Sequence, residues 1–169
     1  IRDSLITEYN PFHLGHLYHL QKAKIDTNCD GVICIMSGNF MQRGIPAIID
    51  KWERANIAVA NGVDLVIELP LVYSISSAEG FAHGACSILN STGVVNSIYF
   101  GSESGNIEEL KRISQVLIRE PEDFKSNLKL QLDKGVPFHT ARKIALKNCL
   151  HDICCEEIIG SSNNILAIE

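Results

Sequence analysis

The sequence lacks the excess of basic residues that marks most nucleic-acid-binding surfaces. Its 169 residues contain 15 Lys and Arg against 20 Asp and Glu, which gives a formal net charge of -5 with His neutral. On this balance we expect the segment alone to bind RNA or DNA poorly. A small ligand that carries phosphate is still compatible with it, because a helix N-terminus and a few local cations suffice to hold phosphate.

Long apolar runs are also missing. No stretch approaches the ~18 apolar residues that a membrane-spanning helix needs. The N-terminus carries no signal-peptide pattern, and the chain begins at Ile1 instead of Met, which suggests a trimmed end. We therefore expect a cytoplasmic protein that makes no membrane contact.

Patterns that would hold a metal ion or a disulfide framework are absent too. None of the six cysteines forms a C-x-x-C pair, and the adjacent Cys154 and Cys155 do not suit a zinc ribbon. His13, His16 and His19 would spread over about 120° of a helix, so they do not converge on one ion. We expect reduced, mostly packed thiols and no metal bound by the protein's own side chains.

The sequence does contain a regular alternation of short apolar runs and helical patterns. Continuous apolar runs are typical of strands that are buried on both faces. The expected strands are Leu5–Thr7, Val32–Met36, Leu65–Ile67 and Ser97–Phe100. The expected helices between them are residues 15–28, 50–61 and 75–91. This order predicts an α/β fold with a Rossmann-like, doubly wound parallel sheet.

After residue 105 the pattern is helical only. The expected helices are residues 106–119, 122–134 and 138–150. Asn106 is suited to cap the first of them, and Gly135 and Pro137 separate the last two. The sheet is thus expected to be followed by a helical C-terminal part.

The end of the chain suggests that it continues in the complete protein. Ser161–Asn164 is a natural helix cap, yet the chain stops at Glu169, barely a turn later. A helix that short is not stable alone. We expect a single nucleotide-binding domain over residues 1–169, truncated at its C-terminus.

The strongest chemical signal is the turn that follows the first expected strand. It reads Glu8-Tyr9-Asn10-Pro11-Phe12-His13-Leu14-Gly15-His16 and leads into a helix. Ligands of open α/β sheets bind beyond the carboxyl ends of strands, and a helix N-terminus attracts phosphate. Pro11 stiffens the turn and Gly15 permits close approach of backbone or ligand. His13 and His16 lie one turn apart, which predicts that both donate hydrogen bonds to phosphate oxygens.

A second polar segment, Met36–Gly44, follows the second expected strand. It is interpreted equally well as a substrate or phosphate loop with Arg43 as its cation, and as a solvent loop. Lys51 and Arg54 follow on the next helix. Each either faces the same cleft or is a solvated helix charge, and the second reading is the commoner one.

Two weaker segments complete the pattern. Phe100–Glu103 follows the fourth strand, where glycine would let an adenine or ribose pass close. Gly160–Asn164 is a small, polar helix start. An ordinary turn explains the first segment, and helix capping explains the second. A nucleotide contact is indicated there only because the other segments point to a nucleotide.

Taken together, these residues resemble a known family. Tyr9–His16 looks like the strand-turn-helix motif of HIGH nucleotidylyltransferases. Several blocks are more closely similar to the bacterial tRNA(Met) cytidine acetate ligase family. They are Thr7–His19, Met36–Gly44, Asp50–Trp52, Gly62–Pro70, Phe100–Glu103 and Asn163–Leu166. Arg2-Asp3-Ser4 departs from that family, whose first strand is apolar, and the family's chains are much longer.

The resemblance implies an enzyme that makes acetyl-adenylate from ATP and acetate. It would then acetylate the wobble cytidine of elongator tRNA(Met) to N4-acetylcytidine. We predict His13, His16, Arg43 and Lys51 as catalytic residues, and Mg²⁺ as the counterion of pyrophosphate. The tRNA is expected to bind mainly through the part of the family that this chain lacks. The implied ATP contacts are Ile6, Thr7, Glu8, Tyr9, Asn10, Pro11, Phe12, His13, Leu14, Gly15, His16, Leu17, Tyr18, His19, Gly101 and Asn163.

Two alternative functions stay open. A small-molecule adenylyltransferase would use the same turn, with a phosphate of a phosphorylated metabolite as nucleophile instead of a carboxylate. A non-catalytic nucleotide-binding module would bind ATP yet release no pyrophosphate with any acid. Dependence of pyrophosphate exchange on acetate would distinguish the three.

Overall fold

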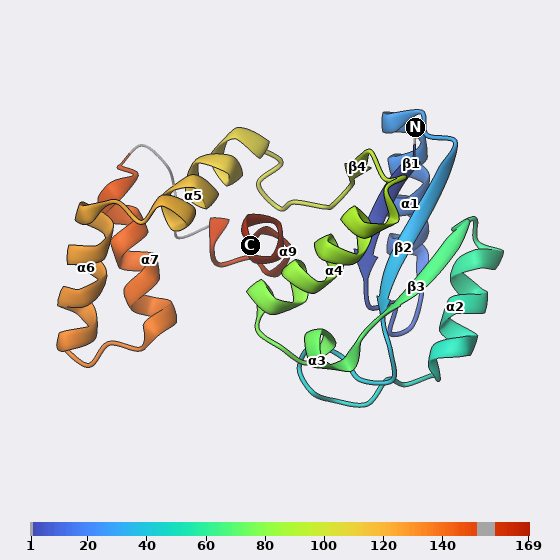
Figure 1. Cartoon of the computed structure of the whole chain (residues 1–169), viewed down its shortest axis with the longest axis horizontal. Helices are drawn as coiled ribbons and strands as arrows, with labels where there is room; N and C mark the ends of the chain where they lie inside the picture. The colour runs from blue at the N-terminus through green and yellow to red at the C-terminus, as the bar shows by residue number, and fades with distance from the viewer. Residues whose placement is uncertain (1, 152–157) are drawn as a thin grey trace. The chain divides into compact units, whose positions relative to one another are not determined.

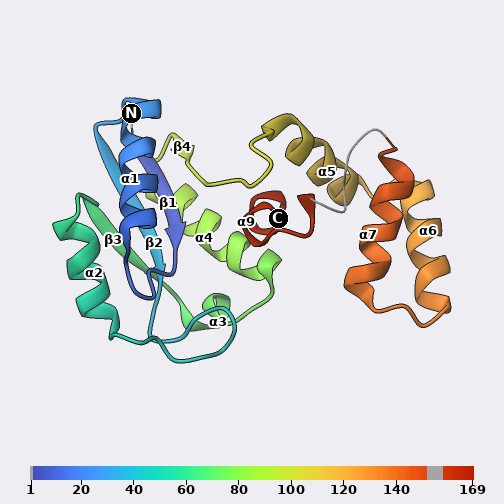
Figure 2. The same cartoon turned by 180° about the vertical axis from the view of Figure 1, so that it is seen from behind.

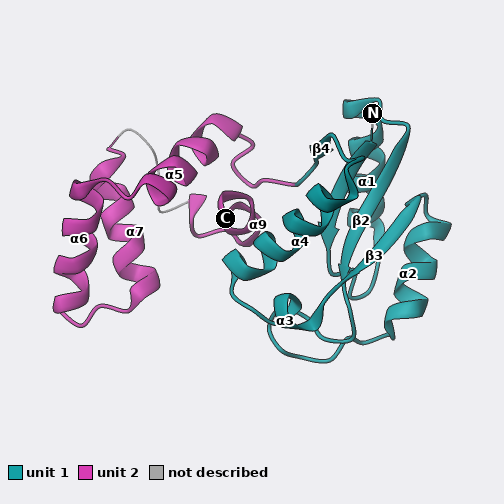
Figure 3. Cartoon of the chain, in the orientation of Figure 1, with its two compact units in different colours: residues 1–100 teal, residues 101–169 magenta. Residues whose placement is uncertain are grey.

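The structure is a computed structural model that describes residues 2–151 and 158–169. It divides into two compact units, residues 1–100 and residues 101–169, which are coloured separately in Figure 3. The single domain expected from the sequence over residues 1–169 stays a prediction. Two of the six cysteines, Cys154 and Cys155, lie outside the described residues.

The first unit is built on a four-stranded parallel sheet. Its strands are β1 (Arg2–Thr7), β2 (Gly31–Ser37), β3 (Leu65–Leu69) and β4 (Ser97–Ile98), in the order β3-β2-β1-β4. The chain moves outward from β1 to β3 and then returns to the other side of β1. The carboxyl ends of β1 and β4 therefore flank the point where the strand order reverses, which is where open α/β sheets bind ligands.

Helices cover both faces of this sheet. They are α1 (Leu14–Thr27), α2 (Lys51–Ala60), α3 (Leu71–Ser74) and α4 (Ala78–Thr92). Parallel connections are right-handed, so the two outward crossovers lie on one face and the return crossover on the other. Figures 1 and 2 show α1 and α2 on one face and α4 on the opposite face. The doubly wound sheet is thus confirmed; the short α3 was not expected from the sequence.

One buried cluster of the first unit joins the sheet to α1 and α2. β2 is buried along nearly its whole length, as its continuous apolar sequence predicted. Leu5 of β1 packs with Leu20 and Ala23 of α1, and all three are buried. Burial of such side chains contributes about 1.5–3 kcal/mol each for the larger ones, relative to leaving them exposed.

The polar start of β1 has a structural partner. Asp3 and Ser4 are fully buried. Asp3 Oδ1 accepts a hydrogen bond from Ser97 Oγ at 3.0 Å, and Ser4 Oγ donates to the Ser97 carbonyl at 2.9 Å. These residues therefore attach the short β4 to β1 with side-chain bonds that an apolar strand would lack.

The second unit is helical, as the sequence predicted. Its described helices are α5 (Ile107–Arg119), α6 (Glu122–Asp133), α7 (Phe138–Cys149) and α9 (Ser162–Ile168). Asn106 caps α5, and its side chain accepts from the N–H groups of Glu108 and Glu109. Ile113, Phe124 and Leu146 bring α5, α6 and α7 into one buried cluster. None of the helices among the described residues is long and apolar enough to cross a membrane.

Candidate active site

The turn after β1 is built on a buried tyrosine. Tyr9 adopts a left-handed backbone conformation (φ 47°), and its side chain is buried. Its ring contacts Phe12 edge-on at 4.8 Å between centroids, and His16 at 4.9 Å. Burial raises the pKa of Tyr9 far above its ordinary value, so the phenol stays protonated. Tyr9 therefore packs against Phe12 and His16 as a neutral aromatic residue and supports the turn through these contacts.

His13 and His16 form a stacked pair at the N-terminus of α1. Their ring centroids lie 3.7 Å apart with an interplanar angle of 24°. His13 is the N-cap, and its Nδ1 accepts from the Gly15 N–H at 3.0 Å. The His13 N–H donates to His16 Nδ1 at 3.3 Å. Because both Nδ1 atoms accept, each neutral imidazole carries its proton on Nε2, which leaves an Nε2–H to donate to a ligand.

His16 is uncharged around physiological pH. The pKa of His16 is lowered to about 4, first by burial and then by the proximity of His13 and His19. A half-buried imidazole that stays uncharged presents a hydrogen-bond donor without repelling the N-terminal dipole of α1. The site is therefore suited to bind phosphate oxygens through hydrogen bonds.

Gly15 makes room for this arrangement. A Cβ atom at Gly15 would lie 2.9 Å from His13 Cε1 and 3.1 Å from His13 Nδ1. The sequence suggested that Gly15 admits backbone or ligand, and the structure shows that its immediate neighbour is the capping imidazole. A side chain here would push the ring of His13 out of its capping position.

The segment after β2 is tied to the β1 turn by two hydrogen bonds. The Gln42 N–H donates to Glu8 Oε1 at 2.7 Å, and the Ile48 N–H donates to Asn10 Oδ1 at 2.8 Å. The predicted neighbourhood of the two segments is thus present in the structure. Arg43 is exposed, and no described residue pairs with it. Its guanidinium is free to meet an anion.

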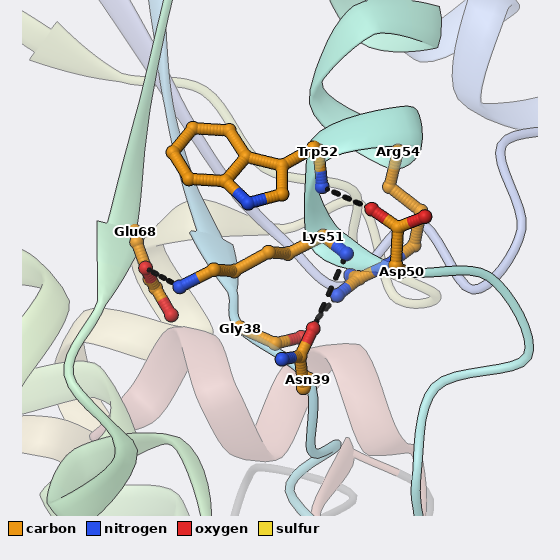
Figure 4. Close-up of polar contacts among 7 residues, drawn as sticks. All are labelled: Gly38, Asn39, Asp50, Lys51, Trp52, Arg54 and Glu68. Carbon is orange, nitrogen blue, oxygen red and sulfur yellow. Dashed lines mark hydrogen bonds and ion pairs between the residues drawn. The ribbon is translucent and has the colours of Figure 1, made fainter.

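Lys51 lies at the start of α2, and its charge is already paired. Lys51 Nζ contacts Glu68 Oε2 of β3 at 2.6 Å, and the Lys51 N–H donates to Asn39 Oδ1 at 3.2 Å (Figure 4). Trp52 is 71% exposed, with Lys51 Nζ 5.5 Å from the centroid of its ring. Glu68 was not expected from the sequence, because its strand reads as a plain apolar run.

Arg54 overturns the commoner sequence interpretation, that of a solvated helix charge. Its side chain is fully buried (0% exposed) and reaches to the carboxyl edge of the sheet. The guanidinium donates to the carbonyls of Glu8, Gly38 and Ile49. Burial lowers the pKa of Arg54, whereas the carboxylates of Glu8, Asp50 and Glu68 oppose that shift.

The spacing of Arg54 and Ala58 along the sequence is the one signal that could have indicated the burial of Arg54. Arg54 and Ala58 are four residues apart and share the buried face of α2. An arginine on an apolar helical stripe is more often assigned to the edge of the stripe, where its head reaches water. Here the carbonyls at the strand ends replace that water.

In the second unit, the two distant segments predicted to contact ATP lie together. Ser102 Oγ donates to Asn164 Oδ1 at 2.7 Å. The carboxylate of Glu103 accepts from the N–H groups of Asn163 and Asn164 at 3.4 and 3.2 Å. Gly101, next to Ser102, is exposed, as is Asn163. Because both belong to the second unit, their contact with a nucleotide stays a prediction.

The remaining predicted contacts divide by exposure. Leu14 is 82% exposed at the start of α1, whereas His19 is half-buried with its ring 5.3 Å from that of Tyr99, just beyond β4. Burial lowers the pKa of His19. Within residues 2–151 and 158–169, no group of three or more His, Cys, Asp or Glu side chains is placed to hold a metal ion.

The amino-acid sequence is similar to a known protein family and to curated proteins. Residues 3–169 match the family model described as HIGH nucleotidyl transferase. The chain is 60% identical over 166 residues to a tRNA(Met) cytidine acetate ligase of Clostridium novyi, which covers 98% of this chain and 42% of that protein. It is 56% identical over 172 residues to a ligase of the same name from Clostridium perfringens, covering 98% and 43%. The chain thus spans less than half the length of these curated relatives.

The fold of the chain is also similar to that of solved structures. A crystal structure of Thermotoga maritima TmcAL bound with alpha-thio ATP has a TM-score of 0.94 and 46% sequence identity, covering 99% of this chain and 41% of that one. An apo structure of the same protein has a TM-score of 0.95 at 46% identity, covering 99% and 40%. The α/β fold with its helical C-terminal part is therefore shared along nearly the whole chain.

Proposed function

The chain belongs to the HIGH nucleotidyl transferase family, and from that premise we propose that it is the ATP-binding, adenylate-forming part of a tRNA(Met) cytidine acetate ligase. The observation that carries the proposal is the stacked pair His13 and His16 at the N-terminus of α1. The names of the Clostridium relatives and the ATP analogue in the Thermotoga structure support the choice of substrates.

ATP lies with its phosphates over the start of α1 in this proposal. The two Nε2–H groups and the free N–H groups of the first helical turn donate to the phosphate oxygens. Arg43 supplies a cation from the loop after β2. Lys51 would have to release Glu68 before it could do the same, because the two side chains are paired. The role of Gly101 and Asn163 would be to contact the rest of the nucleotide.

The reaction proceeds in two balanced steps. An acetate oxygen attacks the α-phosphorus, the bond from that phosphorus to the bridging oxygen breaks, and pyrophosphate leaves with the bonding pair. Charge that builds up on the leaving group is stabilised by the donors already aimed at it. The N4 amine of cytidine then attacks the acetyl carbonyl, AMP leaves, and the amine loses a proton. No covalent enzyme intermediate is required.

Mg²⁺ is not assigned to a protein site in this proposal. The described residues offer no cluster that fits it, so we derive no step through the ion. Magnesium commonly binds to protein sites together with substrate phosphates. Its expected place is on the polyphosphate as part of the substrate.

The tRNA is proposed to bind largely outside this chain. The net charge of -5 argues against an extensive phosphate-binding surface on this segment. The curated relatives are more than twice as long as the matched region. We therefore expect the remaining length to supply most of the basic surface, and the reaction to take place in the cytoplasm, where tRNA is.

The first test is calorimetric titration of ATP with Mg²⁺ into this chain and two variants. His16→Asn keeps an acceptor near the position of Nδ1 but has no group at Nε2. His139→Asn is the control, because His139 is exposed on α7 in the second unit. We expect His16→Asn to weaken ATP binding at least about tenfold, as loss of a hydrogen bond to a charged group does. The control should match the parent protein.

The second test addresses the nucleophile. A hybrid in which this chain replaces the matching segment of the Clostridium novyi relative is assayed for exchange of labelled pyrophosphate into ATP. Exchange that needs acetate supports the ligase. Exchange that needs a phosphorylated compound instead would establish an adenylyltransferase, and ATP binding without exchange would leave a non-catalytic module.

A further inference from the structure

We propose that Arg54 is a positioning residue that holds the β1 turn and the loop after β2 in the spacing that ATP requires. The inference rests on the proposed function, since it assigns a role within the same ATP site. It concerns a residue that touches no reacting atom in the proposed mechanism. Its guanidinium instead joins three backbone segments at the carboxyl edge of the sheet.

The contacts are directed to one segment each. Arg54 Nη1 donates to the Glu8 carbonyl, just after β1, at 2.6 Å. Nη2 donates to the Gly38 carbonyl, just after β2. Nε donates to the Ile49 carbonyl at 3.1 Å, which fixes the segment that enters α2. Figure 4 shows the guanidinium near Gly38, with the Lys51 side chain extending past Gly38 to Glu68.

Burial of the Arg54 guanidinium costs free energy of hydration. An apolar side chain that only filled this space would not have that cost. A fully buried guanidinium loses its hydration, and here no described hydrogen bond or ion pair joins it to a carboxylate. Three carbonyls replace that hydration. In return, the carbonyls of Glu8, Gly38 and Ile49 each gain a charged donor.

A short path leads from this contact to the imidazole pair. Glu8 is followed by Tyr9, whose ring lies 4.9 Å from that of His16. The Glu8 side chain accepts from the Gln42 N–H, next to Arg43. Displacement of the Glu8 backbone would therefore shift both the support of His16 and the anchor of the loop that carries Arg43.

Lysine cannot replace this geometry. Its three donors diverge from a single nitrogen, whereas the guanidinium directs five N–H groups from three nitrogens in one plane. Arg54→Lys keeps the charge, and much of the length of the side chain, but cannot reach carbonyls of all three segments at once. It is therefore the conservative variant that tests positioning and not charge.

The chain offers a matched control at the opposite edge of the sheet. Lys24, near the end of α1, donates to the Gly62 carbonyl at 2.5 Å, just before β3. Like Arg54, it is a cation that ties a helix to a backbone carbonyl, but at the amino edge. Lys24→Met should lower the melting temperature without disturbing the turn after β1.

The experiment compares the parent chain, Arg54→Lys and Lys24→Met by two readouts. The first is the set of imidazole resonances of His13 and His16 in the absence of nucleotide. The second is ATP affinity by calorimetry. We expect Arg54→Lys alone to shift both sets of resonances and to weaken ATP binding about tenfold or more. If Arg54→Lys only lowers the melting temperature, as Lys24→Met does, the positioning role is wrong.

If Arg54→Lys does not fold, a measurement on the parent protein still tests the positioning role of Arg54. Coupling between two sites is reciprocal, so a contact that favours ATP binding must itself be stabilised by ATP. Saturating ATP should therefore slow hydrogen exchange at the Arg54 Nε–H severalfold. Unchanged exchange in the presence of bound ATP would overturn the proposal.

Failure of the proposed function would give a different result. In that case the parent chain binds no ATP, while the imidazole resonances still report whether Arg54→Lys disturbs the turn. Shifted resonances without ATP binding would keep Arg54 as the organiser of the turn and reject ATP as the ligand. Unshifted resonances would reject Arg54 whatever the ligand.

Discussion

At the scale of single residues, the two nitrogens of His16 have separate tasks that substitution can separate. Nδ1 accepts from the His13 N–H, and Nε2 is left for the ligand. Asparagine imitates the first and glutamine, with its longer side chain, can place an N–H near the second. In the hybrid protein we expect His16→Asn to slow acetate-dependent exchange about 100-fold, as loss of a transition-state donor does. His16→Gln should keep a measurable part of the rate; equal loss in both variants would contradict a donor at Nε2.

The same imidazole predicts a dependence of stability on pH. The pKa of His16 is about 4 in the folded chain and about 6.5 when unfolded, so the unfolded chain binds more protons between those values. The neutral imidazole therefore contributes stability above about pH 6.5 that is lost as the pH falls towards 4. Because the ring is partly exposed, we expect the loss to be on the order of 1–2 kcal/mol, less than the full shift would give.

Urea unfolding at several pH values from 4 to 7 measures this contribution. The carboxyl groups of the chain also titrate in this range, so the quantity of interest is the difference between the parent chain and His16→Asn. That difference should narrow as the pH falls. A difference that is constant with pH would show that His16 does not titrate in this way.

At the scale of elements, α2 is the helix that presents Lys51 and Arg54, and its start depends on Asp50. The Asp50 carboxylate accepts from the N–H groups of Trp52 and Glu53 at 2.8 and 3.2 Å. Asp50→Ala should lower the free energy of unfolding by about 1 kcal/mol, the usual cost of losing such a cap. Thermal unfolding measures it, and Glu53→Ala on the same exposed turn is the control. An equal loss in both would argue against the cap.

The positions of the helices and strands along the chain were largely predictable from the sequence, whereas the burial of individual polar side chains was not. Continuous apolar runs identified the four strands, and the cap residue Asn106 located a helix start. The pattern missed α3, which is a single turn of four residues after Pro70. It also favoured a solvated position for Arg54, because two of the carbonyls that the guanidinium contacts, those of Glu8 and Gly38, follow strands more than a dozen residues away in sequence.

In the candidate site, too, some contacts could be predicted from local sequence and others could not. The stacked pair follows from the spacing of the N-cap His13 and of His16 in the first turn of α1, which a local pattern contains. The pairing of Lys51 with Glu68 does not, because it depends on the register of β3 against β2. Local spacing therefore predicts which residues carry the chemistry, and sheet register decides which charges are free to use.

At the scale of the whole molecule, the open question is how much of the nucleotide site the second unit supplies. Within that unit, Asn163 lies beside Glu103, whose carboxylate already accepts from the N–H groups of Asn163 and Asn164 in the first turn of α9. A phosphate is therefore disfavoured at this helix start, and a contact to the sugar or base is the form of interaction that fits. We expect Asn163→Ala to weaken ATP binding about tenfold in calorimetry, the effect of one polar contact.

Asn148→Ala is the matched control for that prediction. Asn148 is also exposed in the second unit, where its side chain donates to Asn127 Oδ1 at 2.8 Å. If both variants bind ATP like the parent chain while His16→Asn does not, the nucleotide is held by the first unit alone. If Asn163→Ala alone is weakened, adenylate formation depends on both units at once.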